Sequence, residues 1–445
     1  MSVATRTRPR IHRAWWVALG VLAALVAAAG FRSSTGALIE PIEAEFGWSR
    51  ATTSGAVSAN LLIYGLTAPF AAALMERFGL RRVLTTALLL VSVGSGLTVL
   101  ISQPWQLWLL WGLFVGVGTG AMALVLGSVV ANRWFATKRG LVTGFFSAAS
   151  STGQLIFLPA FAALANGPGW RYAALITAAT SLLLVPVALF VVADRPEDVG
   201  TTPYGTASAP RHEAAQPAAV APADMDGTPR HTPAPARLTA LRVLRESSRS
   251  GPFWVLMGTF FVCGWSTNGL VGTHFIPAAH DHGMVATTAA GLLALIGVFD
   301  IAGTIASGWL TDRVDPRLLL VAYYVLRGLS LLLVPVVLGP DVHPNLFFFI
   351  VFYGLDWVAT VPPTMALCRR YFGLERSSIV FGWVFASHMV GAGIAASYAG
   401  WVRQGTGDYF TAWLTAGALC IVAGFACLRL TTPASSVAGG ATVGR

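Results

Sequence analysis

The chain has 445 residues, of which 55% are hydrophobic and 11% are charged. A typical soluble domain carries about 25% charged residues, so this composition excludes a water-soluble protein. The net charge of +10 does not indicate nucleic-acid binding, because no basic stretch interleaved with aromatic residues forms a separate domain.

Apolar segments follow one another along the whole chain. Many are about 20 residues long, the length that crosses a hydrocarbon core of about 30 Å. The sequence predicts twelve membrane spans, at residues 14–37, 50–75, 82–101, 104–131, 139–165, 170–193, 252–276, 286–310, 317–339, 344–368, 377–402 and 408–430.

The first segment resembles a secretory signal, since basic residues from Arg6 to Arg13 precede an apolar run from Trp15 to Gly30. The apolar part of a signal usually has about 7–15 residues. This run is longer, and its removal would leave an odd number of helices. We therefore expect it to remain as the first transmembrane helix.

The 29 Lys and Arg residues indicate the orientation. Most of them fall on one side of the predicted spans, and positive charge is typical of the cytoplasmic side. We expect a multi-pass protein of the cell inner (plasma) membrane, with the N-terminus and the tail at 433–445 in the cytoplasm.

Residues 194–250 are expected to form a cytoplasmic linker, since they are rich in Pro, Ala and Thr and lack a helical hydrophobic period. The basic end of this segment, Arg237 to Arg249, is either a solvated tether or a short helix on anionic lipid. The four cysteines all lie in predicted spans without paired spacing, so we expect no disulfide framework, metal site or cofactor.

Two similar sets of residues lie about 237 positions apart. Arg133-Trp134-Phe135, Arg139, Gly144 and Gly153 correspond to Arg370-Tyr371-Phe372, Arg376, Gly382 and Gly391, and Glu76 to Arg81 corresponds to Asp312 to Arg317. A repeated unit in so apolar a chain predicts an all-α membrane protein with two pseudo-symmetric six-helix bundles, residues 1–193 and 251–432. Such internal repeats are typical of secondary transporters.

The loop after the second predicted span, Ala72 to Arg82, resembles the signature of the major facilitator superfamily: Gly, three residues, Asp-Arg, any residue, Gly, then basic residues. Ala72 and Glu76 replace the Gly and the Asp here, whereas the second copy keeps Gly308 and Asp312. The resemblance implies gating loops whose charged groups latch the outward-facing state through charge-assisted bonds. Their residues would be Glu76, Arg77, Arg81, Asp312, Arg313 and Arg317.

Further motifs resemble the branch of oxalate/formate antiporters and monocarboxylate transporters. They are Glu45 to Arg50 before the second span, Trp134-Phe135, Arg139-Gly140-Leu141, Gly144, Pro159, Gly169-Trp170-Arg171, and Arg195 to Gly200 after the sixth span. The resemblance implies transport of a small organic acid by alternating access, with proton symport.

Ionisable side chains at membrane depth cost at least about 2.5–3.5 kcal/mol each, so each calls for a reason. The predicted spans contain Arg32, Asp300, Arg327, Asp356 and His388. All but the first belong to the second half, an asymmetry that resembles related carboxylate transporters.

Asp300 lies in a string, Phe299 to Thr304, that resembles the eighth span of monocarboxylate transporters. There an Asp is followed four residues later by an Arg that receives the substrate carboxylate, and one helical turn places both on one face. Here Thr304 takes the place of the Arg. We expect Asp300 to serve proton coupling or gating, or else to be a structural acid bonded to a neighbouring helix.

Arg32 lies close to the position of a functional lysine in the first span of the same family. The resemblance implies that it binds the substrate carboxylate, which an Arg fork matches with two bonds. Alternatively, the side chain extends toward the outer surface near Glu40 and Glu43.

Asp356 and His388 fall near the middle of the tenth and eleventh predicted spans. Either is a candidate for carrying the coupled proton and for contacting substrate, because a histidine titrates near neutral pH and burial can raise the pKa of a carboxyl toward it. His388 could instead be an interhelical hydrogen-bond donor. A buried ion pair between Arg327 and Asp356 would remove Asp356 from the coupling candidates. Trp357, Asn268 and Trp383 are weaker candidates for the cavity wall.

The sequence thus predicts a secondary active transporter and not an enzyme. No phosphate-binding loop is present, so nothing indicates ATP hydrolysis. Its expected partners are a small organic acid, protons and the lipid bilayer, and we expect a monomer. The alternative is proton-driven efflux of a hydrophobic drug or metabolite, with Arg32 peripheral and the tryptophans forming the binding surface. A transporter-like receptor is a third hypothesis, against which the two retained gating loops argue.

Overall fold

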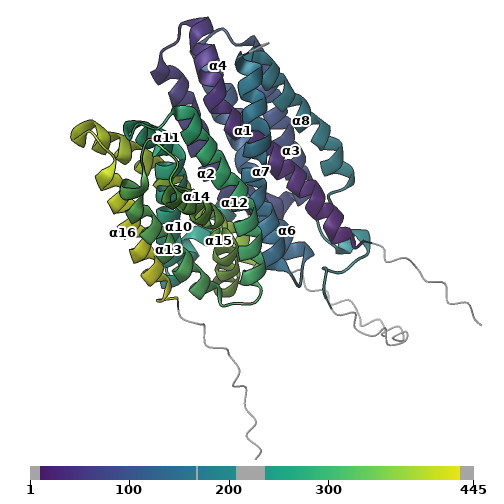
Figure 1. Ribbon diagram of the computed structural model, residues 1–445. Helices are drawn as coiled ribbons and strands as arrows, with labels where there is room; N and C mark the ends of the chain where they lie inside the picture. The colour runs from purple at the N-terminus through teal and green to yellow at the C-terminus, as the bar shows by residue number, and fades with distance from the viewer. Residues whose placement is uncertain (1–10, 167–168, 207–235, 431–445) are drawn as a thin grey trace, which may run out of the picture. The chain divides into compact units, whose positions relative to one another are not determined.

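The computed structural model describes residues 11–166, 169–206 and 236–430, and these residues are helical almost throughout (Figure 1). The chain divides into two compact units, Met1–Val243 and Leu244–Arg445. The division falls within the segment that the sequence predicts as a linker.

Unit 1 contains the first six predicted spans. Its helices are α1 (Arg13–Phe46), α2 (Arg50–Phe78), α3 (Leu80–Leu97), α7 (Arg139–Asn166) and α8 (Trp170–Phe190), with a fourth pass made of α4 (Pro104–Leu107), η2 (Trp108–Val115), α5 (Gly116–Ala121) and α6 (Leu124–Trp134). Short turns of 3-10 helix, η1 (Thr98–Leu100) and η3 (Glu197–Val199), follow α3 and α8.

Unit 2 contains the last six. The seventh pass of the chain is made of α10 (Gly251–Gly264), η4 (Trp265–Val271) and α11 (Gly272–Asp281). It is followed by α12 (Ala286–Thr311), α13 (Pro316–Val337), α14 (Pro344–Asp356), α15 (Val361–Thr406) and α16 (Phe410–Cys427). α9 (Ala236–Ser247) precedes them and crosses the boundary between the units.

The predicted number of spans is confirmed in the described part of the chain. Ten helical stretches there are long and apolar enough to cross a membrane, and one of them, Pro344–Thr406, has 63 residues. Within that stretch Gly373 adopts φ 74° and ψ 167°, which interrupts the helix, so the stretch makes two passes. α7, a further helix of 28 residues, completes the twelve.

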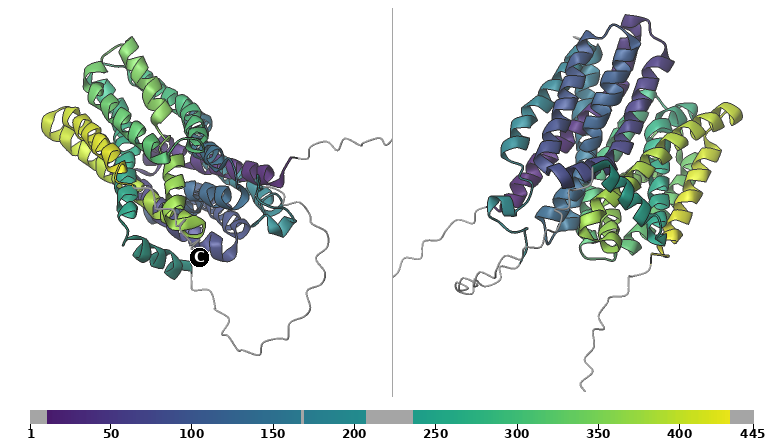
Figure 2. Two further views of the ribbon diagram at one scale, coloured as in Figure 1. Left: turned by 90° about the horizontal axis from the view of Figure 1, so that it is seen from below. Right: turned by 180° about the vertical axis from the view of Figure 1, so that it is seen from behind.

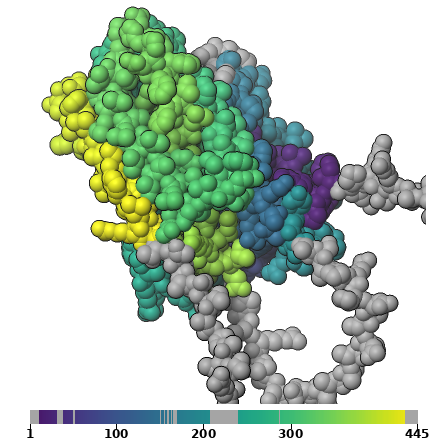
Figure 3. Space-filling view, turned by 60° about the horizontal axis from the view of Figure 1, so that its bottom comes forward, coloured from purple at the N-terminus to yellow at the C-terminus, as the bar shows by residue number. Residues whose placement is uncertain are grey.

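Each unit packs its helices in the same pairs, as the repeat predicts. In unit 1, α1 packs on α7, α3 on α8, and α2 on α5 and η2; in unit 2, α10 packs on α15, α13 on α16, and α12 on α14. Figures 1 and 2 show α1 beside α7 in the purple and blue unit, and Figure 3 shows the yellow α16 along one side of the green helices of unit 2. The two units therefore share one architecture.

Two glycines at corresponding positions permit close contacts in these pairs. A Cβ atom at Gly153 of α7 would lie 2.5 Å from the carbonyl oxygen of Val26 in α1, and a Cβ at Gly391 of α15 would overlap the carbonyl oxygen of Phe261 in α10. Both distances are too short for any side chain. The repeated glycines are therefore explained by backbone contact between the first and fifth helices of each unit.

The first residues after α8 form a structured segment of unit 1, where the sequence predicted the start of a flexible tether. We call Arg195–Thr206 the strap. The Tyr204 N–H donates to the carbonyl of Trp134 at 2.8 Å, and the Ala136 N–H donates to the carbonyl of Tyr204 at 2.8 Å. The Tyr204 ring lies edge-on to Trp15, with centroids 5.4 Å apart. The strap thus joins the start of α1 to the end of α6.

Candidate functional site

Four of the ionisable residues predicted for the spans lie in unit 2, and all four are buried. They are Asp300 in α12, Arg327 in α13, Asp356 at the end of α14 and His388 in α15. Together with Cys263 of α10, which contacts Arg327, we call them the interior cluster. Because these side chains are buried, exposure to water does not explain why ionisable residues occur in these helices.

Arg327 and Asp356 form the ion pair that the sequence offered as an alternative. Arg327 Nε donates to Asp356 Oδ2 at 2.5 Å, and neither residue is appreciably exposed. The other oxygen, Asp356 Oδ1, is buried without a hydrogen-bond partner among the described residues. A single arginine thus compensates Asp356. We therefore treat Asp356 as the counter-ion of Arg327 and not as a proton carrier.

Asp300 is fully buried, and its Oδ1 accepts two hydrogen bonds. One comes from the hydroxyl of Thr304 at 2.7 Å and one from the backbone N–H of Val358 at 2.9 Å. Thr304, which stands where the family places an arginine, therefore bonds to Asp300 within one helical turn. These two bonds join α12 to its own next turn and to the backbone that follows α14.

His388 lies between aromatic rings. The centroid of its imidazole is 5.0 Å from that of Phe260 and 5.9 Å from that of Phe385, and Nδ1 has no hydrogen-bond partner in the described structure. Its backbone carbonyl lies so close to Gly264 of α10 that no side chain fits there. His388 is therefore packed tightly in an aromatic part of the interior of unit 2.

The weaker wall candidates lie in different surroundings. The Trp357 ring meets Tyr353 edge-on, with centroids 5.6 Å apart, and Trp383 is half-buried in α15. Asn268 is exposed on η4, a stretch of π-helix, a conformation that often marks functional sites. The first-half candidate, Arg32, belongs to α1, but its side chain lies outside the described part of the structure.

Three side chains in or beside the interior cluster, Cys263, Ser307 and Thr360, were missed by the sequence analysis. Arg327 Nη1 donates to Cys263 Sγ at 3.2 Å, Cys263 Sγ lies 3.3 Å from the Thr360 hydroxyl, and Ser307 Oγ donates to the Ala359 carbonyl at 2.5 Å. Cys, Ser and Thr are too common in membrane helices to stand out. The one available signal was Pro362-Pro363, which indicates an interrupted helix nearby.

The loop after α2 makes its described contacts inside unit 1. Glu76 pairs with Arg133 at 2.7 Å, Arg81 Nε donates to the Val192 carbonyl at 2.9 Å, and the Arg77 guanidinium lies 5.0 Å from the centroid of Phe78. The end of α2 is thus bonded to the end of α6 and to the residues after α8.

The second loop repeats this arrangement in unit 2. Arg317 Nη1 donates to the Leu430 carbonyl at 2.6 Å, as Arg81 does to Val192. Asp315 pairs with Arg370, the counterpart of Arg133, at 3.4 Å. Asp312 follows the last residue of α12, and the Arg313 guanidinium lies 4.0 Å from the ring centroid of Trp309. Ion pairs and hydrogen bonds from charged side chains therefore occur at these helix ends in both copies.

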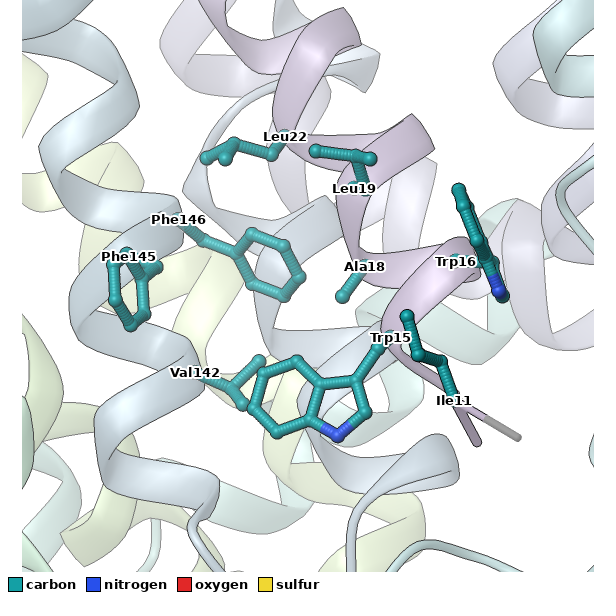
Figure 4. A pocket seen from close by; sticks show the side chains of 9 residues that line it. All are labelled: Ile11, Trp15, Trp16, Ala18, Leu19, Leu22, Val142, Phe145 and Phe146. Carbon is teal, nitrogen blue, oxygen red and sulfur yellow. The ribbon is translucent and has the colours of Figure 1, made fainter. Parts of the chain in front are cut away.

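Unit 1 also contains an apolar groove of about 310 Å³ between α1 and α7 (Figure 4). No charged side chain lines it, so it does not fit a carboxylate. Its lining residues are Ile11, Trp15, Trp16, Ala18, Leu19, Leu22, Val142, Phe145 and Phe146.

Comparison with known sequences agrees with this architecture. The sequence model of the Major Facilitator Superfamily matches residues 20–396 and 275–443. The chain is 26% identical over 425 residues to the uncharacterized MFS-type transporter YcxA of Bacillus subtilis, covering 94% of this chain and 93% of that protein. It is 25% identical to monocarboxylate transporter 13 of Rattus norvegicus (94% and 91% covered) and 27% identical to monocarboxylate transporter 11 of Homo sapiens (92% and 81% covered).

Solved structures show the same fold. The fucose:proton symporter FucP of E. coli (N162A) superposes with a TM-score of 0.63 at 15% identity, covering 94% of this chain and all of that one. The proton:xylose symporter XylE superposes with a TM-score of 0.67 at 14% identity, covering 94% of this chain and 95% of that one. At these identities the likeness concerns the fold alone.

Proposed function

The chain belongs to the major facilitator superfamily of membrane transporters, and we propose that it moves a small organic anion of the monocarboxylate class together with a proton. The observation that carries this proposal is its similarity to proteins named monocarboxylate transporters over at least 92% of its length. We further propose that it works as a monomer in the inner membrane, with both termini in the cytoplasm.

Asp300 is our first candidate for the coupled proton. It is fully buried, and the two donors that reach its Oδ1, the Thr304 hydroxyl and the Val358 N–H, are neutral. Burial inside an apolar span disfavours the charged form of a carboxyl, which favours reversible protonation. His388, with a buried nitrogen free of hydrogen bonds in the described residues, is the second candidate.

The substrate carboxylate needs a positive partner other than Arg327, because the Arg327 guanidinium is paired with Asp356. We assign this role to Arg32, which lies close to the position in the first helix where the resembling family has a functional lysine. Asn268, exposed on the π-helical stretch of the seventh pass, and Trp357 are proposed to contact the rest of the substrate. We propose that the ion pairs and hydrogen bonds of the two cytoplasmic loops act as the gate. The loop residues are Glu76, Arg77 and Arg81 in the first copy and Asp312, Arg313 and Arg317 in the second.

Uptake by proteoliposomes with an imposed pH gradient tests the proposal against a panel of mono- and dicarboxylates. We expect a monocarboxylate to accumulate in response to the gradient. Arg32→Gln should raise KM about tenfold or more, because it removes a charge-assisted bond, and Arg32→Lys should restore part of the affinity. Absence of carboxylate accumulation, or an unchanged KM in Arg32→Gln, contradicts the anion assignment.

Proton coupling is tested separately with Asp300→Asn and His388→Gln. The residue that carries the proton should lose gradient-driven accumulation while carboxylate exchange continues. Asp281→Asn is the matched control, since Asp281 is a carboxylate of the same unit held by Arg403 at 2.7 Å near the end of α11. If both variants retain gradient-driven accumulation, neither residue carries the proton.

One observation favours the alternative function, efflux of a hydrophobic compound: the apolar groove between α1 and α7 with its two tryptophans (Figure 4). In that case Trp16→Ala should lower efflux of a hydrophobic dye and Arg32→Gln should not. A dye efflux that does not respond to Trp16→Ala removes this groove as its binding site.

A further inference from the structure

The tenth pass is interrupted at membrane depth. α14 ends at Asp356 and α15 begins at Val361, and we call the four residues between them, Trp357–Thr360, the break. Within it the backbone makes tight turns, since the Ala359 N–H donates to the Asp356 carbonyl at 3.2 Å and the Val361 N–H to the Val358 carbonyl at 3.0 Å. A helix end leaves backbone groups without intrahelical partners, and hydrocarbon offers none.

Side chains of neighbouring helices supply the missing partners. Arg327 Nη2 donates to the Trp357 carbonyl at 3.1 Å and to the Asp356 carbonyl. From α12, Asp300 Oδ1 accepts from the Val358 N–H at 2.9 Å, and Ser307 donates to the Ala359 carbonyl at 2.5 Å. Two helices thus hold four consecutive residues, Asp356 to Ala359, by their backbone.

We propose that Arg327, Asp300 and Ser307 are positioning residues that hold the break as a preformed bend in the tenth pass, and that transport depends on this bend. The proposal deepens the proposed function, on which its transport readout rests. In this proposal Arg327 holds the backbone of the break and Asp356 is its counter-ion, so neither side chain contacts the substrate.

The number of bonds at Arg327 supports this assignment. Its Nε, Nη1 and Nη2 groups are all engaged, by Asp356 Oδ2, by Cys263 Sγ and by the two carbonyls. A guanidinium has five N–H donors in a fixed plane, so few remain for an anion. A lysine would keep the charge but could not bond to all these acceptors at once.

The position of Ser307 supports it independently. Ser307 is buried and is not charged, so neither substrate charge nor proton transfer explains it. Many buried serine and threonine hydroxyls of the described helices bond to a carbonyl of their own helix, as Ser147 does to Thr143 at 2.9 Å. Ser307 reaches the break instead.

Hydrogen exchange of the purified full-length protein, followed by mass spectrometry of peptides that contain residues 354–361, tests the bend without any substrate. Ser307→Ala and Arg327→Lys should each raise exchange in these peptides about tenfold or more, because each leaves a buried carbonyl without its partner. Ser147→Ala, which removes a buried hydroxyl in unit 1, should leave them unchanged.

A pair of substitutions at Asp300 separates positioning from charge. The amide oxygen of Asp300→Asn still accepts from Val358 N–H, so exchange should stay slow, whereas Asp300→Ala should make it fast. Equal exchange in the two variants contradicts the positioning role of Asp300. This result would leave its proposed role in proton coupling untouched, because that role is measured by gradient-driven uptake.

Transport kinetics complete the test. If transport depends on the bend, Ser307→Ala should lower the maximal rate with little change in KM, and Ser147→Ala should match the wild type. Faster exchange with an unchanged maximal rate would overturn the dependence of transport on the bend. Unchanged exchange in Ser307→Ala and Arg327→Lys would overturn the positioning role itself.

Discussion

Charged residues in an apolar span are conspicuous, so single positions such as Asp300 and Arg327 could be singled out from the sequence. The pairing of Arg327 with Asp356 could be stated there as one of two alternatives. Which alternative holds depends on how α13 packs against α14, which sequence spacing does not fix. The bonds of Ser307 and Cys263 could not be predicted from the sequence for another reason. A neutral residue in a membrane span gives no indication of its partner.

Substitution of Gly391 tests the close backbone contact between α10 and α15. A Cβ there would overlap the Phe261 carbonyl, which belongs to the backbone and cannot move aside alone. Gly391→Ala should therefore destabilise the protein by about 1–3 kcal/mol, the usual cost of overpacking. Thermal unfolding in detergent measures it.

Gly393, two residues further along α15, is the control. A Cβ there meets open space, so Gly393→Ala should stabilise the helix slightly, by about 0.5–1 kcal/mol. Equal unfolding temperatures for the two alanine variants would contradict the proposed backbone contact between α10 and α15.

At the scale of the element, the predicted spans agree with the observed helices because each is a long apolar run, the strongest signal in the sequence. The ends agree less well. α1 continues to Phe46, beyond its predicted end at 37, because residues 38–46 still bury Leu38 and Ile42. The π-helical stretches η2 and η4 were not predicted, because a short π-helical segment inside a long helical span has no sequence signal of its own.

Asp315 lies between α12 and α13, and its role in starting α13 can be tested. Its carboxylate accepts from the Arg317 N–H at 3.0 Å and caps α13. The hydrogen bond from the Arg317 guanidinium lowers the pKa of Asp315 below its ordinary value. Asp315→Ala should cost about 0.5–2 kcal/mol of stability, and Asp315→Asn less, because an amide oxygen also caps a helix.

The pH dependence follows from the lowered pKa. The charge of Asp315 stabilises the fold fully above the ordinary carboxyl pKa of about 3.9 and loses this effect as the pH falls through the lowered value. The difference in unfolding temperature between the wild type and Asp315→Asn should therefore be constant at neutral pH and shrink in acid. A difference that grows in acid would contradict this sign.

At the scale of the whole molecule, the duplication explains which features the two units share and which they do not. The helix pairs, the close glycines and the arginines that bond to Val192 and Leu430 recur in both. The buried charges do not recur: position 64, the counterpart of Asp300, is a tyrosine. Pattern comparison within one sequence could therefore predict the scaffold, and it could also show which half departs from it.

The strap, Arg195–Thr206, has a consequence for cutting this protein in two. Its backbone bonds to Trp134 and Ala136 attach it to unit 1, so we expect a cut after Thr206 to preserve this unit better than a cut after α8. Co-expressed fragments 1–206 and 236–445 should copurify and restore uptake, whereas 1–193 with 236–445 should yield much less assembled protein. Equal yields would mean that the strap is dispensable for assembly. For reporters, epitope tags and inserted domains, we therefore expect an insertion within the strap to disturb unit 1.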